Sequence, residues 1–380
     1  MISVFFIFLF FAQSAFGEEL KFAYQNGKIH RIENWDNKKL NGRSSLFNRD
    51  GLLIAEWVYK DGVLEGQIKH YYSNAKLKRN SQYAKGKLVG DSEVFFADGN
   101  VLSKSSFKNG KLNGRLELFY SSGQKFADKF FVDNQLKGLA KFFNQNGKPI
   151  QEINYKNNLV DGALKLFFDS GKIKMAQNYR NGNLQGEWKE YYDTGELMKE
   201  GVHVDHAKMG PETSYYKNGN KQTELFWNRN VLEGELKVYF ENGNIKLLQN
   251  WKKGIGNGFF IEFFSNRSVK SIAQVANGKK QGTVYEYYPD GGLRFEWRFV
   301  QDKLDGLVKE YFENGIVRAT GSFQDGKKNG VTTGYYSDGK LKNVLTFRND
   351  LLNGKAVIYN PEGKVQNESI FENGIVKEGN

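Results

Sequence analysis

The chain has 380 residues, with 55 Lys and Arg against 43 Asp and Glu and a formal net charge of +12 at pH 7. It contains no cysteine, which excludes disulfides, and only four histidines, which leaves little material for a metal or nucleophilic centre. The basic balance favours anionic partners, and the 31 Phe, 20 Tyr and 6 Trp supply the apolar area that must hold the chain together.

The first segment, residues 1–17, carries no charge and is almost wholly apolar from Ile2 to Ala12. That run is too short to span a bilayer comfortably, and Ala15 and Gly17 place small residues where a signal peptidase reads them. The segment lacks an early Lys or Arg, so an uncleaved anchor is the alternative. We expect a signal peptide at 1–17, and an exported mature chain that is periplasmic, at the cell surface or secreted.

From residue 18 onward the sequence repeats every 24 residues without insertion or deletion. Each repeat opens on a glycine: Gly42, Gly66, Gly90, Gly114, Gly138, Gly162, Gly186, Gly210, Gly234, Gly258, Gly282, Gly306, Gly330 and Gly354. An aromatic residue stands five positions later and is usually followed by a second one, as in Tyr71-Tyr72 and Tyr191-Tyr192. A fixed period of this length is the signature of an array in which each copy contacts its neighbours.

Two further columns keep the same phase and mark the turns. A second glycine follows nine residues after the first, for example Gly51, Gly99, Gly123, Gly195, Gly243, Gly315 and Gly339, with Ala75 and Arg267 as exceptions. Asx-Gly and Ser-Gly pairs between aromatic runs indicate hairpins. Twenty residues after the opening glycine stands Gly, Asn, Asp or His, the residues that best tolerate the left-handed region.

The segments between these turns are about six to eight residues long and rich in Tyr, Phe, Val, Ile and Leu, as strands are. Another aromatic column follows seventeen residues after the opening glycine and is interrupted at His203 and Val275. The sequence therefore predicts an all-β, elongated antiparallel β-hairpin array of about fifteen copies, forming one continuous domain over residues 18–380.

The repeat pattern resembles a known family. The stretches Tyr179–Gly186 and Tyr191–Leu197, with an aromatic pair, x-x-Gly and a spaced glycine, are similar to the MORN repeat in its bacterial variant form, often labelled a YwqK-like antitoxin family. The resemblance covers essentially all of the mature chain. It implies an elongated hairpin array used for binding or scaffolding, and it brings with it an antitoxin role and membrane-lipid binding as family expectations.

No constellation of residues predicts catalysis. His203-Val204-Asp205-His206 could suggest a metal pair, but these histidines stand in the aromatic and left-handed turn columns. Glu286 and Glu310 occupy equivalent positions two strands apart, about 10 Å, which exceeds either spacing that glycosidases use. The glycines are periodic singles and form no phosphate-binding loop. We expect a non-enzymatic protein with no cofactor and no bound metal.

Two stretches depart from the repeat and are the candidate contact surface. In the first, His203 and His206 replace the usual column residues and Lys208 replaces a leucine; in the second, Gly256 replaces that leucine and Arg267 replaces the turn glycine. An array can make its specific contacts where it breaks its own rule, although drift or a local bend is the alternative. The candidate contact residues are His203, His206, Lys208, Lys252, Lys253 and Arg267.

An exported, basic, aromatic-rich array is best interpreted as a binding or scaffolding module of the cell envelope that uses an aromatic-lined, basic sheet surface. Its partner stays open between a protein, an anionic envelope polymer such as peptidoglycan or lipopolysaccharide, and a membrane surface. Export disfavours nucleic acid, although aromatic and basic interleaving is also found on single-strand platforms. An immunity or antitoxin-like role against a partner protein is the other alternative, and solubility alone would also explain the lysines.

Overall fold

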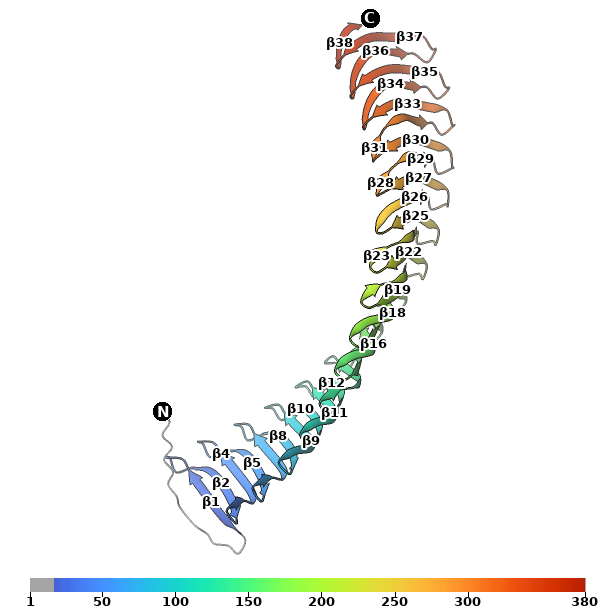
Figure 1. Cartoon of the computed structure of the whole chain (residues 1–380). Coiled ribbons are helices and arrows are strands. Elements are labelled where there is room, and N and C mark those ends of the chain that lie inside the picture. The colour runs from blue at the N-terminus through green and yellow to red at the C-terminus, as the bar shows by residue number, and fades with distance from the viewer. Residues whose placement is uncertain (1–16, 380) are drawn as a thin grey trace. The chain divides into compact units, whose positions relative to one another are not determined.

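The computed structural model describes residues 17–379, which contain 38 β-strands and no helix (Figure 1). The predicted all-β antiparallel hairpin array is confirmed. The signal-peptide prediction concerns residues of which only Gly17 is described. Contacts divide the chain into two units: the first runs to Gly186 and includes Asp193–Gly195, and the second comprises Glu187–Tyr192 and the residues from Glu196 onward.

In both units the strands pair antiparallel in chain order, and each two-residue strand pairs with the same preceding strand as the longer strand that follows it. The strands of the first unit are β1 (Glu18–Ala23), β2 (Ile29–Asp36), β3 (Lys39–Leu40), β4 (Gly42–Phe47), β5 (Leu53–Lys60), β6 (Val63–Leu64), β7 (Gly66–Tyr71), β8 (Leu77–Ala84), β9 (Lys87–Phe95), β10 (Val101–Lys108), β11 (Lys111–Phe119), β12 (Lys125–Val132), β13 (Gln135–Leu136), β14 (Gly138–Phe143), β15 (Pro149–Lys156), β16 (Leu159–Phe167) and β17 (Ile173–Arg180). Strand β18 (Asn183–Tyr191) begins in the first unit and ends in the second.

The second unit continues the same pattern. Its strands are β19 (Leu197–Val204), β20 (Ala207–Lys208), β21 (Gly210–Tyr215), β22 (Lys221–Asn228), β23 (Val231–Leu232), β24 (Gly234–Tyr239), β25 (Ile245–Lys252), β26 (Ile255–Phe263), β27 (Val269–Ala276), β28 (Lys279–Lys280), β29 (Gly282–Tyr287), β30 (Leu293–Val300), β31 (Lys303–Leu304), β32 (Gly306–Tyr311), β33 (Val317–Gln324), β34 (Lys327–Tyr335), β35 (Leu341–Arg348), β36 (Leu351–Tyr359), β37 (Val365–Glu372) and β38 (Ile375–Gly379).

The first turn of each repeat needs only one residue in the left-handed region. In the repeat that opens at Gly42, the Asn48 amide donates to Leu52 O and the Gly51 amide donates to Asn48 O, both at 2.9 Å. Gly51 has φ 86°, and the strand register shifts between Leu46 and Phe47. This is the hairpin in which a type I turn is followed by a left-handed residue at a bulge.

The second turn has two successive residues with positive φ, as in Asp61 (52°) and Gly62 (82°). That is a type I′ turn, whose twist matches the flanking strands. The left-handed column predicted from the sequence is confirmed, and the residue before it shares the conformation. The turn also joins neighbouring repeats, because the Gly62 amide donates to Leu40 O at 2.8 Å.

The opening glycine lies inside a strand, at a bulge. In the repeat at Gly114, the pairing of β10 with β11 shifts between Ser105 and Phe107, and Gly114 has φ 124°. A Cβ on Gly114 would lie 2.9 Å from Ser106 Cβ. Positive φ and this close approach together explain why the most regular column of the sequence is glycine.

In seven repeats of the described chain a tyrosine hydroxyl bonds to the next repeat at the first-turn margin. The Tyr72 hydroxyl donates to Phe95 O at 2.7 Å, and the Tyr336 hydroxyl donates to Tyr359 O at 2.8 Å. The same bond recurs at Tyr24, Tyr120, Tyr192, Tyr216 and Tyr288. The second aromatic of the pair thus satisfies a carbonyl one repeat away while its ring stays half-buried.

The sheet has two faces, which the repeat from Gly306 illustrates. Val308 pairs with Gly321 and Glu310 with Ala319 on one face; this face also carries the later aromatic column and the leucine column, and we call it the ring face. Leu307 pairs with Ser322 and Lys309 with Thr320 on the opposite face, which we call the charge face. The most buried side chains lie in the middle of the ring face: Ala127, Ala140, Ser92 and Glu212.

Candidate ligand-binding hollows of the ring face

The ring face carries a cation over an aromatic ring at the first-turn margin of several repeats. In the second unit, Lys246 lies over Phe240 (5.7 Å to the ring centroid) and Arg318 over Phe312 (5.6 Å). The same pairing joins Lys78 to Tyr72, Lys174 to Phe168, Arg294 to Tyr288 and Lys342 to Tyr336. At such exposed sites each contact is worth about 0.5–1 kcal/mol.

The local fold explains the pairing. The ring is the second aromatic of the repeat and stands where the first turn begins, and the cation comes six residues later on the returning strand. In the second unit five successive repeats place a cation there: Lys246, Lys270, Arg294, Arg318 and Lys342. Equivalent residues are two strands apart, so the cations recur about every 10 Å.

Hollow A is a space of about 410 Å³ between the rings of Phe240 and Phe264. Its remaining lining residues are Lys246, Leu247, Glu262, Phe263, Ser265 and Lys270. The carboxylate of Glu262 forms an ion pair inside the hollow, because Lys270 Nζ lies 3.1 Å from Glu262 Oε2. Hollow A therefore has largely apolar walls and one internal ion pair.

Hollow B, of about 430 Å³, lies in the same columns three repeats further on, between the rings of Phe312 and Tyr336. Its remaining lining residues are Arg318, Ala319, Thr332, Thr333, Gly334, Tyr335, Ser337, Lys342 and Asn343. Two of them are cations and none is acidic. Thr332 Oγ1 is buried without a hydrogen-bond partner, which in a folded protein calls for a water or a ligand. Both volumes fall in the range of about 300–1,000 Å³ that small-molecule sites occupy.

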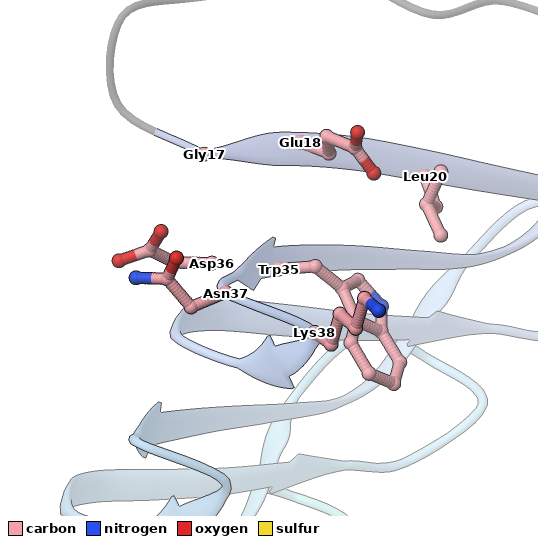
Figure 2. Close-up of a pocket in the computed structure, with 7 residues that line it drawn as sticks. All are labelled: Gly17, Glu18, Leu20, Trp35, Asp36, Asn37 and Lys38. Atoms are coloured by element: carbon pink, nitrogen blue, oxygen red, sulfur yellow. The ribbon is translucent and has the colours of Figure 1, made fainter.

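A third hollow of about 580 Å³ lies at the first described strand and is lined by Gly17, Glu18, Leu20, Trp35, Asp36, Asn37 and Lys38. Figure 2 shows Glu18 and Leu20 on β1 beside Trp35 of the neighbouring strand β2. The Trp35 indole is already engaged, since its Nε1–H donates to Glu33 Oε2 at 3.0 Å. The hollow adjoins residues outside the described part of the chain, and we assign it no role.

The first departure from the repeat proves to be a closed cluster of charges and rings, which we call the Lys208 cluster. Glu212 is only 2% exposed, and its two carboxylate oxygens lie 2.8 Å from Lys199 Nζ and 2.6 Å from Lys208 Nζ. Lys208 also lies 5.9 Å from the ring centroid of Trp188 and 4.9 Å from that of Trp227. Lys208, which replaces the usual leucine, is therefore engaged by side chains of this chain.

His203 belongs to the same cluster, with its ring 5.8 Å from that of Trp188. Burial, together with the nearby Lys208, lowers the pKa of His203, and Glu212 partly opposes the shift. The neighbouring Gly201 makes room for the indole, because a Cβ there would lie 2.9 Å from Trp188 Nε1. Trp188 Nε1, Trp227 Nε1 and His203 Nδ1 are buried without hydrogen-bond partners.

The other candidate contact residues stand in turns or at a strand end. His206 has φ 66° and fills the second position of a type I′ turn. Lys253 has φ 51° and its amide donates to Glu233 Oε2 at 2.8 Å, directly after Lys252, the last residue of β25. Arg267 takes the glycine conformation of the first turn at φ 75°, and its Nε–H donates to Asn244 Oδ1 of the preceding repeat at 2.8 Å.

These six residues therefore do not gather into one pocket. Nor does the second departure open a hollow at Gly256: a Cβ there would lie 2.6 Å from Phe260 Cζ, so the ring of Phe260 occupies the space of the missing leucine. Hollows A and B lie elsewhere on the ring face. The signal that could have found them is the run of cations six residues after the second aromatic, which lies in a column that the sequence analysis did not follow.

The charge face is a lattice of hydrogen bonds and ion pairs. The Tyr71 hydroxyl donates to Glu56 Oε2 and the Tyr215 hydroxyl to Glu200 Oε1, both at 2.8 Å. Burial, and then these hydrogen bonds, raise the pKa of Tyr71 and of Tyr215 to about 12. Within residues 17–379 no group of three or more His, Asp or Glu side chains could hold a metal ion, and no helix could cross a membrane.

The repeat matches the model of a known family. The model described as "MORN repeat variant" matches residues 88–109, 136–157, 160–181, 184–205, 232–253, 280–301, 304–325 and 328–349. These segments are MORN repeats of the variant type. The intervals between matched MORN segments include 206–231 and 254–279, which contain the two departures from the repeat.

The solved structures that match the chain resemble it only weakly. No curated protein matches the chain. Among solved structures, "Crystal Structure of TcdB2-TccC3-Cdc42" and "Crystal Structure of TcdB2-TccC3" are each 10% identical with a TM-score of 0.17, covering 94% and 93% of this chain. The Photorhabdus luminescens Tc holotoxin pore with the TccC3-D651A mutation is 9% identical with a TM-score of 0.15 over 93% of this chain. The chain spans 26% of the length of each of these structures.

Proposed function

We propose that this MORN-repeat protein is a non-catalytic binding scaffold of the cell envelope that holds an anionic envelope polymer along its ring face. The observation that carries the proposal is the run of five cations at one column of the second unit, where Lys246, Arg294, Arg318 and Lys342 lie over half-buried rings. A polymer has its own repeat, and it can engage equivalent groups that recur about every 10 Å.

Three of the five cations in this column are paired with glutamates of the described chain and two are not, and the two unpaired cations favour an anionic partner. Lys270, Arg294 and Arg318 each lie 3.1 Å from a glutamate of their own repeat, namely Glu262, Glu286 and Glu310. Within residues 17–379, no carboxylate lies within ion-pair distance of Lys246 or Lys342. The unpaired cations flank the paired ones, so a long ligand would meet free charge at both ends of the run.

Binding by several weak, equivalent contacts needs no catalytic arrangement of side chains. Each contact is modest, but contacts linked along one polymer add through effective concentration. MORN repeats generally serve as binding or scaffolding modules, and this surface gives that role a physical basis. The location in the envelope rests on the signal-peptide prediction for residues 1–17.

Co-sedimentation tests the proposal. The full chain should sediment with isolated cell-wall sacculi, and the bound fraction should fall as salt rises from about 50 to 300 mM because screening weakens exposed charge contacts. A matched incubation with neutral cellulose should leave the protein in the supernatant. Recovery of one stoichiometric crosslinked protein from the envelope, with no sedimentation on sacculi, would instead support the antitoxin-like alternative and overturn the proposal.

A further inference from the structure

Hollow B differs from its neighbours by the loss of one carboxylate. In the three preceding repeats the position four residues after the opening glycine is Glu262, Glu286 and Glu310, and each pairs with the cation of its own repeat. In the next repeat this position is Gly334. Lys342, which stands where the paired cations do, consequently has no carboxylate within ion-pair distance among the described residues.

The local packing keeps this position free of a side chain. A Cβ on Gly334 would lie 2.8 Å from Asn343 Oδ1 and 3.1 Å from Asn343 Nδ2. The amide of Asn343 thus stands where the glutamate stem runs in the preceding repeats, and it lines the hollow. A neutral group that can both donate and accept hydrogen bonds has taken the place of the negative charge.

The remaining lining is suited to a hydroxylated anion. Arg318 and Lys342 supply two positive charges, and Glu310, the partner of Arg318, does not line the hollow. Thr332 Oγ1 is a buried hydroxyl oxygen without a partner, and it can donate and accept at once. The rings of Phe312 and Tyr336 provide apolar surface, while the Tyr336 hydroxyl is engaged with Tyr359 O and stays out of recognition.

We infer that hollow B binds one acidic sugar residue of a glycan: its anionic group between Arg318 and Lys342, its hydroxyls on Thr332 and Asn343, and its C–H surface on the two rings. This deepens the proposed function by naming a ligand class, and it depends on that function only for its biological setting. An acyl chain would leave the threonine hydroxyl and Lys342 unsatisfied, and a simple inorganic anion would not use the rings.

Hollow A provides the matched control. It has two aromatic walls and two cations from the same columns, but it contains the carboxylate of Glu262 and no partnerless buried polar atom among its lining residues. The lining charge, two cations against one carboxylate, is half that of hollow B. Lys270 stands in hollow A where Lys342 stands in hollow B, so the same substitution can be made in each hollow.

The test is a titration of the full chain with a galacturonic-acid trimer, followed by isothermal calorimetry. The Lys342→Gln variant should bind about tenfold more weakly, the effect of losing one charge-assisted hydrogen bond, and Lys270→Gln should stay within about twofold of the parent, because Lys270 is already paired with Glu262. The neutral galactose trimer should bind at least about tenfold more weakly than the acidic one. Thermal melts should show that both variants are folded.

Three results would overturn the inference: no saturable binding of the acidic trimer, equal losses from the two glutamine variants, or inorganic phosphate competing as well as the trimer. Phosphate competition would identify an anion site without sugar recognition. Vesicles of anionic phospholipid should not displace the trimer, and displacement would point to a membrane instead. Sedimentation of the parent chain on sacculi, together with no saturable binding of the trimer, would leave the broader function standing while removing this ligand, so the two failures are distinguishable.

Discussion

The repeats that open at Gly210 and Gly330 share the same columns but use their charges in opposite ways. Glu212 and Thr332 are equivalent, and so are Lys208 and Lys328, each of which lies over an aromatic ring, Trp227 at 4.9 Å or Phe347 at 5.1 Å. In the first repeat the carboxylate of Glu212 closes the cluster from within. In the second, a hydroxyl stands in its place without a partner.

The difference teaches that one side chain in the middle of the ring face decides whether the lysines of a repeat are paired with a carboxylate or left open to a ligand. A buried carboxylate requires cations, and the Lys208 cluster supplies two of them. Where Thr332 stands instead, Lys328 and Lys342 have no carboxylate partner among the described residues. The repeat at Gly210, which departs clearly from the sequence pattern, therefore pairs its charges internally. The repeat at Gly330, which leaves a lysine unpaired, departs from the pattern hardly at all.

The largest expected effect comes from opening the closed cluster. Replacing Glu212 with Thr leaves Lys199 and Lys208 without their carboxylate, and breaking a buried pair costs about 3–5 kcal/mol. Both lysine side chains are about a third exposed and can recover water, so we expect about 2 kcal/mol, measured by urea unfolding. The double variant with Lys208→Leu should recover most of this loss; no recovery would mean that the ion pairs do not hold the cluster.

The converse change should close hollow B. Replacing Thr332 with Glu places a carboxylate where Glu212 stands in the closed repeat, near Arg318, Lys342 and the Lys328 column. We expect binding of the galacturonic-acid trimer to fall at least about tenfold, because the new charge repels the ligand and engages the cations. Stability should change by less than about 1 kcal/mol. Unchanged affinity in the calorimeter would contradict the comparison.

The charge face of the Gly210 repeat should contribute independently of the cluster. Replacing Tyr215 with Phe removes its hydrogen bond to Glu200 and should cost about 1 kcal/mol in the parent and in the Glu212→Thr background alike. Unequal costs in the two backgrounds, from a double-mutant cycle of urea melts, would show that the faces are coupled.

Alkaline pH gives a second measure of the same group. The folded pKa of Tyr215, about 12, lies above the ordinary value near 10, so folding favours the protonated phenol. Its contribution is fully present below pH 10 and is lost as pH rises toward 12. Unfolding curves recorded between pH 9 and 12 should therefore fall more steeply for the parent than for Tyr215→Phe, and parallel curves would contradict the assignment.

The smallest effect is expected at the open repeat. Replacing Lys342 with Gln removes a cation–π contact from an exposed side chain, and the free energy of unfolding should change by no more than about 0.5 kcal/mol. The free energy of unfolding should therefore fall much less for Lys342→Gln than for Glu212→Thr. A large destabilisation by Lys342→Gln would place that lysine in the structural framework and would remove it from recognition.

The unbroken 24-residue period determined the strand order, the hairpins and the left-handed turn column, because local backbone geometry at glycine, Asx and aromatic positions is the same in every copy. His203 and Lys208 could be singled out as departures for the same reason. Nothing in the local sequence indicated that Lys208 faces Glu212, or that Gly334 removes the partner of Lys342. These relations join residues on neighbouring strands, and only the register of the sheet sets which side chains meet across it.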